Sequence, residues 1–203
     1  LHADAEYKQA LAFGWAVGGY RFDFYIKNDK TLPVLALGDQ SLVDQIQSLV
    51  SATALTRDLI NTPAGDMMPE QLAQSAKVLV TEFGGQVSQM IGDELLTQNY
   101  PTIHAVGRAS IHQPQLIDLR WGDKHHPKVT LVGKGVCFDS GGLDLKPASG
   151  MRLMKKDMGG AAHVLGLARL IMSRQLPINL RVLVPAVENA VSNNAFRPGD
   201  VIT

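Results

Sequence analysis

Residues 132–160 form a glycine-dense, largely apolar stretch, and four of its charged side chains could do chemistry together. Lys134 and Asp139 lie at or just past the end of an apolar run that is typical of a buried strand, and Asp157 precedes an apolar segment typical of a helix. Lys146 lies between them. Burying an unpaired charge is costly, so these groups need either solvent or a specific partner. A lysine and two aspartates near a strand end and a helix start indicate a cation site.

The residue types suit a divalent metal. Aspartates are common oxygen ligands of Zn²⁺, Mn²⁺ and Mg²⁺. A lysine amine binds a metal only after losing its proton, and burial beside a dication favours that loss. In open α/β sheets, sites form at the carboxyl ends of strands. We therefore expect Lys134, Asp139 and Asp157 to meet in one crevice.

Each residue taken alone also has a structural interpretation. Asp157 is placed as a helix N-cap would be, and the run 139–142 (Asp-Ser-Gly-Gly) is good turn chemistry. Lys146 alone would be a solvated lysine. Lys134 is harder to explain structurally, because glycines flank it at the end of an apolar strand. A phosphate-binding loop is excluded, since neither the Walker pattern nor Gly-x-Gly-x-x-Gly occurs.

Composition narrows the protein class. The chain has 203 residues, 45% of them hydrophobic, with zero formal net charge. This balance gives no electrostatic reason to expect nucleic acid or a membrane surface as the partner. No apolar run reaches the ~18 residues of a membrane span. Cys137, the single cysteine, excludes an internal disulfide, and its apolar neighbours favour a buried small hydrophobe.

Hydrophobic periodicity predicts alternating helices and strands. Helices are expected at residues 2–17, 42–60, 69–83, 93–99 and 158–173, and strands at 32–37, 86–91, 115–121, 128–137 and 180–187. The alternation of strand 115–121 is typical of an outer strand, and Pro185 predicts an end or edge position for the last one. Residues 20–25 are read as a docked arm or short strand. The pattern favours an α/β fold, a three-layer α/β/α sandwich with a mostly parallel central sheet.

The stretch closely resembles the leucyl (cytosol) aminopeptidase family of two-metal metallopeptidases. The resemblance rests on Val132–Gly135, Phe138–Gly142, Leu145–Pro147 and Met154–Ala162, with support from Tyr20–Asp23, Thr56–Pro63 and Phe196–Val201. By this resemblance, residues 1–30 are an N-terminal helix and arm leading into the catalytic domain, and residues 31–203 are a partial catalytic domain.

The resemblance implies a role for five residues. Lys134, Asp139 and Asp157 match metal ligands, with Asp139 touching both metals. Lys146 matches the catalytic lysine that stabilises the oxyanion, and Met154 matches a residue of the pocket for the substrate's first side chain. The implied protein is a cytoplasmic homo-hexamer that uses two Mn²⁺ or Zn²⁺ ions to release N-terminal, leucine-like residues from peptides. The alternative is a non-catalytic member that keeps the fold for DNA binding or assembly.

The sequence also departs from the family pattern. The family completes its site with an Asp-x-Glu-x-Arg segment, which supplies further carboxylates and an arginine that holds a bicarbonate, and the 203 residues do not contain it. We therefore expect the chain as given to bind metal poorly and hydrolyse little. Asp144 and Arg152 stand where many members have Ser and Asp, and neither matches a ligand position.

Overall fold

The computed structural model describes residues 4–27, 31–193 and 195–202. Its helices are α1 (Ala5–Gly18), α2 (Gln40–Asn61), α3 (Pro69–Glu82), α4 (Glu94–Thr97), α5 (Pro101–Gly107), α6 (Ala148–Met151) and α7 (Gly159–Ser173), with 3₁₀ turns η1 (Ala64–Asp66) and η2 (Met154–Met158). Its strands are β1 (Gln86–Ile91), β2 (Gln115–Trp121), β3 (Lys128–Val132), β4 (Gly135–Asp139) and β5 (Asn179–Asn189). The alternation predicted from the sequence is therefore present.

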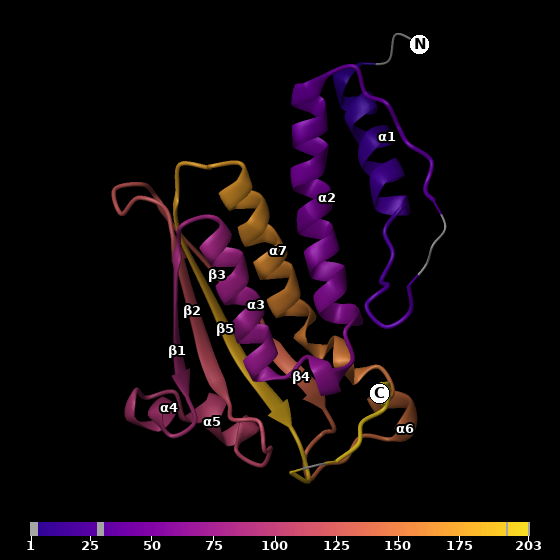
Figure 1. Cartoon of the computed structure of the whole chain (residues 1–203). Helices are drawn as coiled ribbons and strands as arrows, with labels where there is room; N and C mark the ends of the chain where they lie inside the picture. The colour runs from indigo at the N-terminus through magenta and orange to yellow at the C-terminus, as the bar shows by residue number, and fades with distance from the viewer. Residues whose placement is uncertain (1–3, 28–30, 194, 203) are drawn as a thin grey trace.

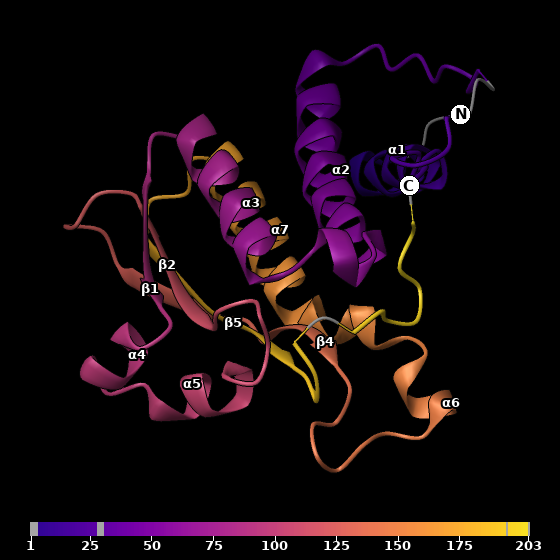
Figure 2. The ribbon, with the colours of Figure 1, turned by 60° about the horizontal axis from the view of Figure 1, so that its bottom comes forward.

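One mixed sheet forms the centre of the molecule. Its order is β1-β2-β5-β3, and β4 also pairs with β5. Because β2 alone runs against its neighbours, four of the five strands point the same way. Figure 2 shows α3 and α7 on one side of this sheet and the short α4 and α5 on the other. The predicted α/β class, with strands mostly in one direction between helical layers, is confirmed.

The core lies between the sheet and the helices α3 and α7. Alternate residues of β5 are buried, among them Leu180, Val182 and Val184, as the period of two in a strand requires. They meet buried side chains of α7 such as Leu165, while Leu72 from α3 belongs to the same cluster. Helix α2 packs along α7, and α1 packs on α2 at the outer side (Figure 1). This core fixes the strand ends that carry the candidate site.

Three strand predictions were wrong. Strand 128–137 is two strands, β3 and β4, separated at Gly133 and Lys134. Residues 32–37 have no regular structure, although they are apolar. Strand β2 is not an outer strand, because it lies between β1 and β5 and its first five residues are all buried.

Pro185 lies inside a central strand rather than at an edge. Val132 of β3 pairs with Leu183, and Gly135 of β4 pairs with Ala186, so Pro185 faces the break between the two strands. The missing N–H of proline therefore costs no ladder hydrogen bond there. The break between β3 and β4 therefore accounts for the presence of Pro185 inside a central strand.

The N-terminal helix and arm rest on α2. Asp39 caps α2, accepting hydrogen bonds from the backbone N–H groups of Ser41 (2.9 Å) and Leu42 (3.3 Å). The arm after α1 is irregular, which was one of the two expected forms, and Tyr20 anchors it to Asp58. Among the described residues, no helix is long and apolar enough to cross a membrane.

Candidate metal centre

Lys134 occupies the break between β3 and β4, against the start of α7. A Cβ on Gly133 would lie 2.6 Å from the carbonyl oxygen of Gly160, and a Cβ on Gly160 would lie 2.8 Å from the backbone nitrogen of Lys134. Only glycines permit this approach. The backbone N–H of Ala161 donates to the Lys134 carbonyl at 2.8 Å, which fixes the helix start against the strand break.

This close approach brings Lys134 to Asp157 in η2. Their Nζ and Oδ2 atoms are 2.8 Å apart, and the side chains are 59% and 17% exposed. Asp157 is not the N-cap of α7, since Met158 takes that place without a side-chain hydrogen bond. Oδ2 of Asp157 is buried and is paired with the Lys134 ammonium. A buried carboxylate oxygen whose partner is a cation suits a metal ligand.

Asp139 ends β4 and forms the second lysine–aspartate pair. Its Oδ2 lies 3.0 Å from Nζ of Lys146. The loop between them closes on itself, because the Lys146 N–H donates to the Ser140 carbonyl at 2.9 Å. Asp139 Oδ1 accepts a hydrogen bond from the Gly141 N–H at 2.9 Å. The loop thus returns Lys146 to Asp139 instead of leaving it solvated.

The electrostatic surroundings of Asp139 favour its ionised form. Burial by itself would raise the pKa of this carboxyl group. Hydrogen bonds from Lys146, Gly141 and Asn189 outweigh burial and lower the pKa below its usual value. Asp139 is therefore a carboxylate at neutral pH, the form that a metal ligand needs.

The two pairs lie in one region, because β4, which ends at Asp139, packs against η2, which contains Asp157. The set of candidate metal ligands is small. Among the residues that the structure describes, no three His, Cys, Asp or Glu side chains lie close enough together to hold a metal ion. The chemistry fits a divalent cation nonetheless, with the carboxylates of Asp139 and Asp157 and the amine of Lys134. Met154, the predicted pocket residue, is half-buried at the start of η2 and packs on the core.

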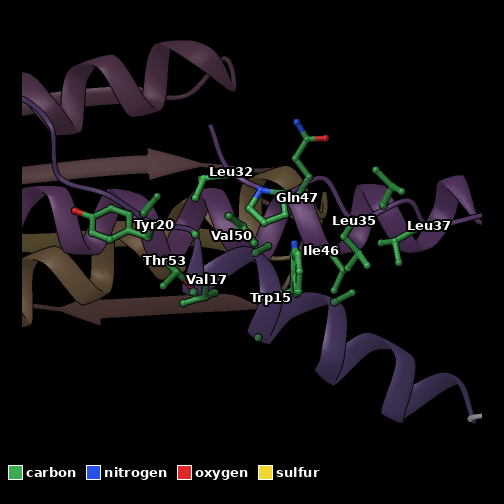
Figure 3. Close-up of a pocket in the computed structure, with 18 of the residues that line it drawn as sticks. Trp15, Val17, Tyr20, Leu32, Leu35, Leu37, Ile46, Gln47, Val50 and Thr53 are labelled. Carbon is green, nitrogen blue, oxygen red and sulfur yellow. The ribbon is translucent and has the colours of Figure 1, made fainter. Parts of the chain in front are cut away.

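A large cavity lies elsewhere, between α1, α2 and residues 32–37. Its volume is about 890 Å³, and Trp15, Leu35, Ile46 and Val50 are among the side chains that line it (Figure 3). None of the five predicted site residues lines this cavity. Among the described residues, its lining is mostly apolar and holds no carboxylate, histidine, cysteine or lysine, so the candidate centre remains the region of the lysine–aspartate pairs.

Comparison with known proteins identifies the family. Residues 54–203 match the model of the cytosol aminopeptidase family, catalytic domain. This chain belongs to that family. It is 37% identical over 211 residues to a probable cytosol aminopeptidase of Clostridium perfringens, covering 96% of this chain and 43% of the relative. It is 39% identical over 209 residues to a probable cytosol aminopeptidase of Chlamydia muridarum, covering 97% of this chain and 42% of the relative.

Solved structures of cytosol aminopeptidases and related enzymes share the fold. The cytosol aminopeptidase of Coxiella burnetii has a TM-score of 0.90 and 52% identity, covering 97% of this chain and 43% of that one. The bottromycin maturation enzyme BotP, solved in complex with Mn, has a TM-score of 0.83 and 35% identity, covering 98% of this chain and 44% of BotP. The chain thus spans less than half the length of these relatives.

One residue of the candidate site was missed from the sequence. Asn189, the last residue of β5, donates from Nδ2 to Asp139 Oδ1 at 2.8 Å. A signal was present, since a polar residue ends a buried parallel strand at the edge where Asp139 ends another. Strand 180–187 was predicted two residues too short at this end, which left Asn189 outside it.

Proposed function

We propose that this chain carries part of the catalytic centre of a metal-dependent aminopeptidase. Lys134, Asp139 and Asp157 would hold divalent metal at the edge of the sheet. The observation that carries the proposal is that β4 and η2 bring together two lysine–aspartate pairs, Lys134 with Asp157 at 2.8 Å and Lys146 with Asp139 at 3.0 Å. Membership of the cytosol aminopeptidase family supports the same assignment.

The side chains have distinct tasks in this proposal. Bound divalent ions supply a water of lowered pKa and polarise the scissile carbonyl group. Lys146 is partly exposed, at 32%, so its ammonium can reach a substrate and donate to the oxygen that gains negative charge. Asp139 holds Lys146 in place through the 3.0 Å contact. Met154 would offer an apolar wall to the substrate's first side chain.

The metal and substrate are proposed by analogy with relatives. BotP was solved in complex with Mn, and a leucyl aminopeptidase of Trypanosoma brucei, which is 34% identical with a TM-score of 0.70 over 77% of this chain, in complex with bestatin. We therefore propose two Mn²⁺ or Zn²⁺ ions and peptides with leucine-like N-terminal residues. A cytoplasmic homo-hexamer, the assembly implied by the family resemblance, belongs to the same proposal.

The 203 residues alone are proposed to be a weak metal binder with little activity. Within the described residues the candidate ligand set holds two carboxylates and a lysine, and no third carboxylate joins them. A two-metal centre normally has more protein ligands than this. The missing carboxylates would come from an Asp-x-Glu-x-Arg segment such as the family contains.

A chimera tests the proposal. Residues 1–203 are joined to the part of the Coxiella burnetii relative that follows the matched region, and leucine p-nitroanilide hydrolysis is measured with Mn²⁺. We expect hydrolysis by the chimera, little by the chain alone, and a loss of about 10²–10³ in kcat in the chimera carrying Lys146→Met. Lys128→Met, a lysine outside the site at the start of β3, is the control. Equal activity in Lys146→Met and Lys128→Met would refute the role of Lys146.

A further inference from the structure

Asn189 and Asp139 are the paired last residues of two parallel strands. Their Cα atoms are partners in the β4–β5 register, just beyond an irregularity between Val136 and Phe138. The Asn189 amide nitrogen lies 2.8 Å from Asp139 Oδ1. Both residues are half-buried, so this contact is only partly accessible to water. A charge-assisted hydrogen bond in such a place is stronger than a neutral one.

The two oxygens of Asp139 have different partners. Oδ1 accepts from the Gly141 N–H at 2.9 Å and from Asn189 at 2.8 Å. Among the contacts of the described residues, Oδ2 is paired with the ammonium of Lys146, at 3.0 Å. Rotating the carboxylate would break two fixed hydrogen bonds at once. The orientation of Oδ2 is therefore determined by groups that bind Oδ1.

The backbone around Asn189 is built to hold its side chain. The Asn189 carbonyl accepts from the Ser140 N–H at 3.0 Å and from the Ser140 hydroxyl at 2.7 Å. Gly142 has φ +64°, and a Cβ there would lie 2.8 Å from the Asn189 side-chain oxygen. A larger residue at position 142 would displace the amide. Asn189 thus holds Asp139 through its side-chain amide, and it holds the loop that carries Lys146 through its backbone carbonyl.

We propose that Asn189 is a positioning residue for the metal ligand Asp139. This inference rests on the proposed function. By donating to Oδ1 while carrying no charge, the amide orients Oδ2 toward the site and leaves the negative charge for the metal and Lys146. An aspartate at this position could not donate and would repel Asp139. Hydrogen-bonding partners of metal ligands commonly change metal affinity 10–100-fold when they are lost.

The test is a titration of the 203-residue chain with Mn²⁺, followed by the electron paramagnetic resonance signal of the free ion. We expect the dissociation constant to rise at least tenfold in Asn189→Leu, which has a similar volume and no donor. The control is Asn179→Leu at the opposite end of β5. Thermal unfolding is measured for both variants, because a purely structural role would lower the midpoint without a selective loss of affinity.

A double-mutant cycle gives a second measurement. Gly142→Ala should also weaken Mn²⁺ binding, because its methyl group displaces the Asn189 amide. The combined variant should lose less affinity than the sum of the two single losses, since both variants remove the Asn189 contact, and only the loss that Gly142→Ala causes through its left-handed backbone should remain separate. Fully additive losses would overturn the inference.

The failures of the inference and of the proposed function can be distinguished. If the wild-type chain binds Mn²⁺ and Asn189→Leu binds it equally well, the inference is overturned while the proposed function stands. If the wild-type chain shows no Mn²⁺ binding at all, the proposed function is refuted, and the proposed role of Asn189 is refuted with it. Should Asn189→Leu not fold, the Gly142→Ala variant alone decides: unchanged affinity would overturn the inference.

Discussion

Tyr20 shows how one residue ties the N-terminal arm to the domain. Its hydroxyl donates to Asp58 at 2.7 Å and accepts from Asn61 at 3.1 Å, and the guanidinium of Arg57 lies 5.1 Å from its ring centroid. Burial first, and then the hydrogen bond to Asp58, raise the pKa of Tyr20 from 10.0 to about 12. The folded protein therefore favours the protonated phenol.

This shift predicts a loss of stability in alkali. A group with a raised pKa stabilises the fold fully below its unfolded pKa, and the contribution disappears as pH rises from about 10 to about 12. At pH 8 we expect wild type to exceed Tyr20→Phe by about 1 kcal/mol in free energy of unfolding, with the gap closing near pH 12. Denaturant unfolding across this range measures it. Tyr7→Phe, at an exposed tyrosine of α1, is the control; a gap independent of pH would contradict the account.

At the scale of elements, the contact between the β3–β4 break and α7 places Lys134 beside Asp157. Gly133→Ala would put a methyl group 2.5 Å from Val164 Cγ2 and 2.6 Å from the Gly160 carbonyl oxygen. We expect a loss of about 1–3 kcal/mol in stability and weaker Mn²⁺ binding, because the helix must move away.

Gly38→Ala is the matched control, since a Cβ there meets nothing within 4 Å. Urea unfolding and Mn²⁺ titration of both variants give the result. If Gly133→Ala binds Mn²⁺ as wild type does, the close approach is not needed for the site.

Most elements followed from the sequence because their patterns are local. The helical spacing of its apolar residues correctly predicted α2, and the predicted helix 158–173 and strand 86–91 correspond to α7 and β1. The break at Gly133 and Lys134 was missed although a lysine between glycines interrupts the apolar run there, because only the pairing with β5 shows that a second strand begins at Gly135. Residues 32–37 have the composition of a strand but no partner in the sheet.

The candidate site was predictable to different degrees. The motif predicted Lys134, Asp139 and Asp157 as candidate ligands, and the structure pairs each aspartate with a lysine. The contribution of Asn189 depends on strand register, 50 residues away in sequence from Asp139. A pattern within one segment cannot show which residue lies beside Asp139 in the neighbouring strand, so only the folded chain reveals the contact with Asn189.

Across the whole molecule, segments that are distant in sequence meet at the carboxyl end of β5. The C-terminal segment is tied there as well: Arg197 forms a buried ion pair with Glu188 of β5, and Asp200 accepts from the Gly65 N–H at 2.8 Å. Three parts of the chain therefore converge beside the end of β5.

The central claim is that Lys134, Asp139 and Asp157 form a metal site, and the most direct measurement is a Mn²⁺ titration of the 203-residue chain. The account predicts weak, saturable binding that Asp139→Asn and Asp157→Asn each abolish, while Asp144→Asn, at an exposed carboxylate of the neighbouring loop, leaves it unchanged. Binding that survives both ligand substitutions would contradict the assignment. Two tightly bound ions on the wild-type chain would contradict the view that its ligand set is partial.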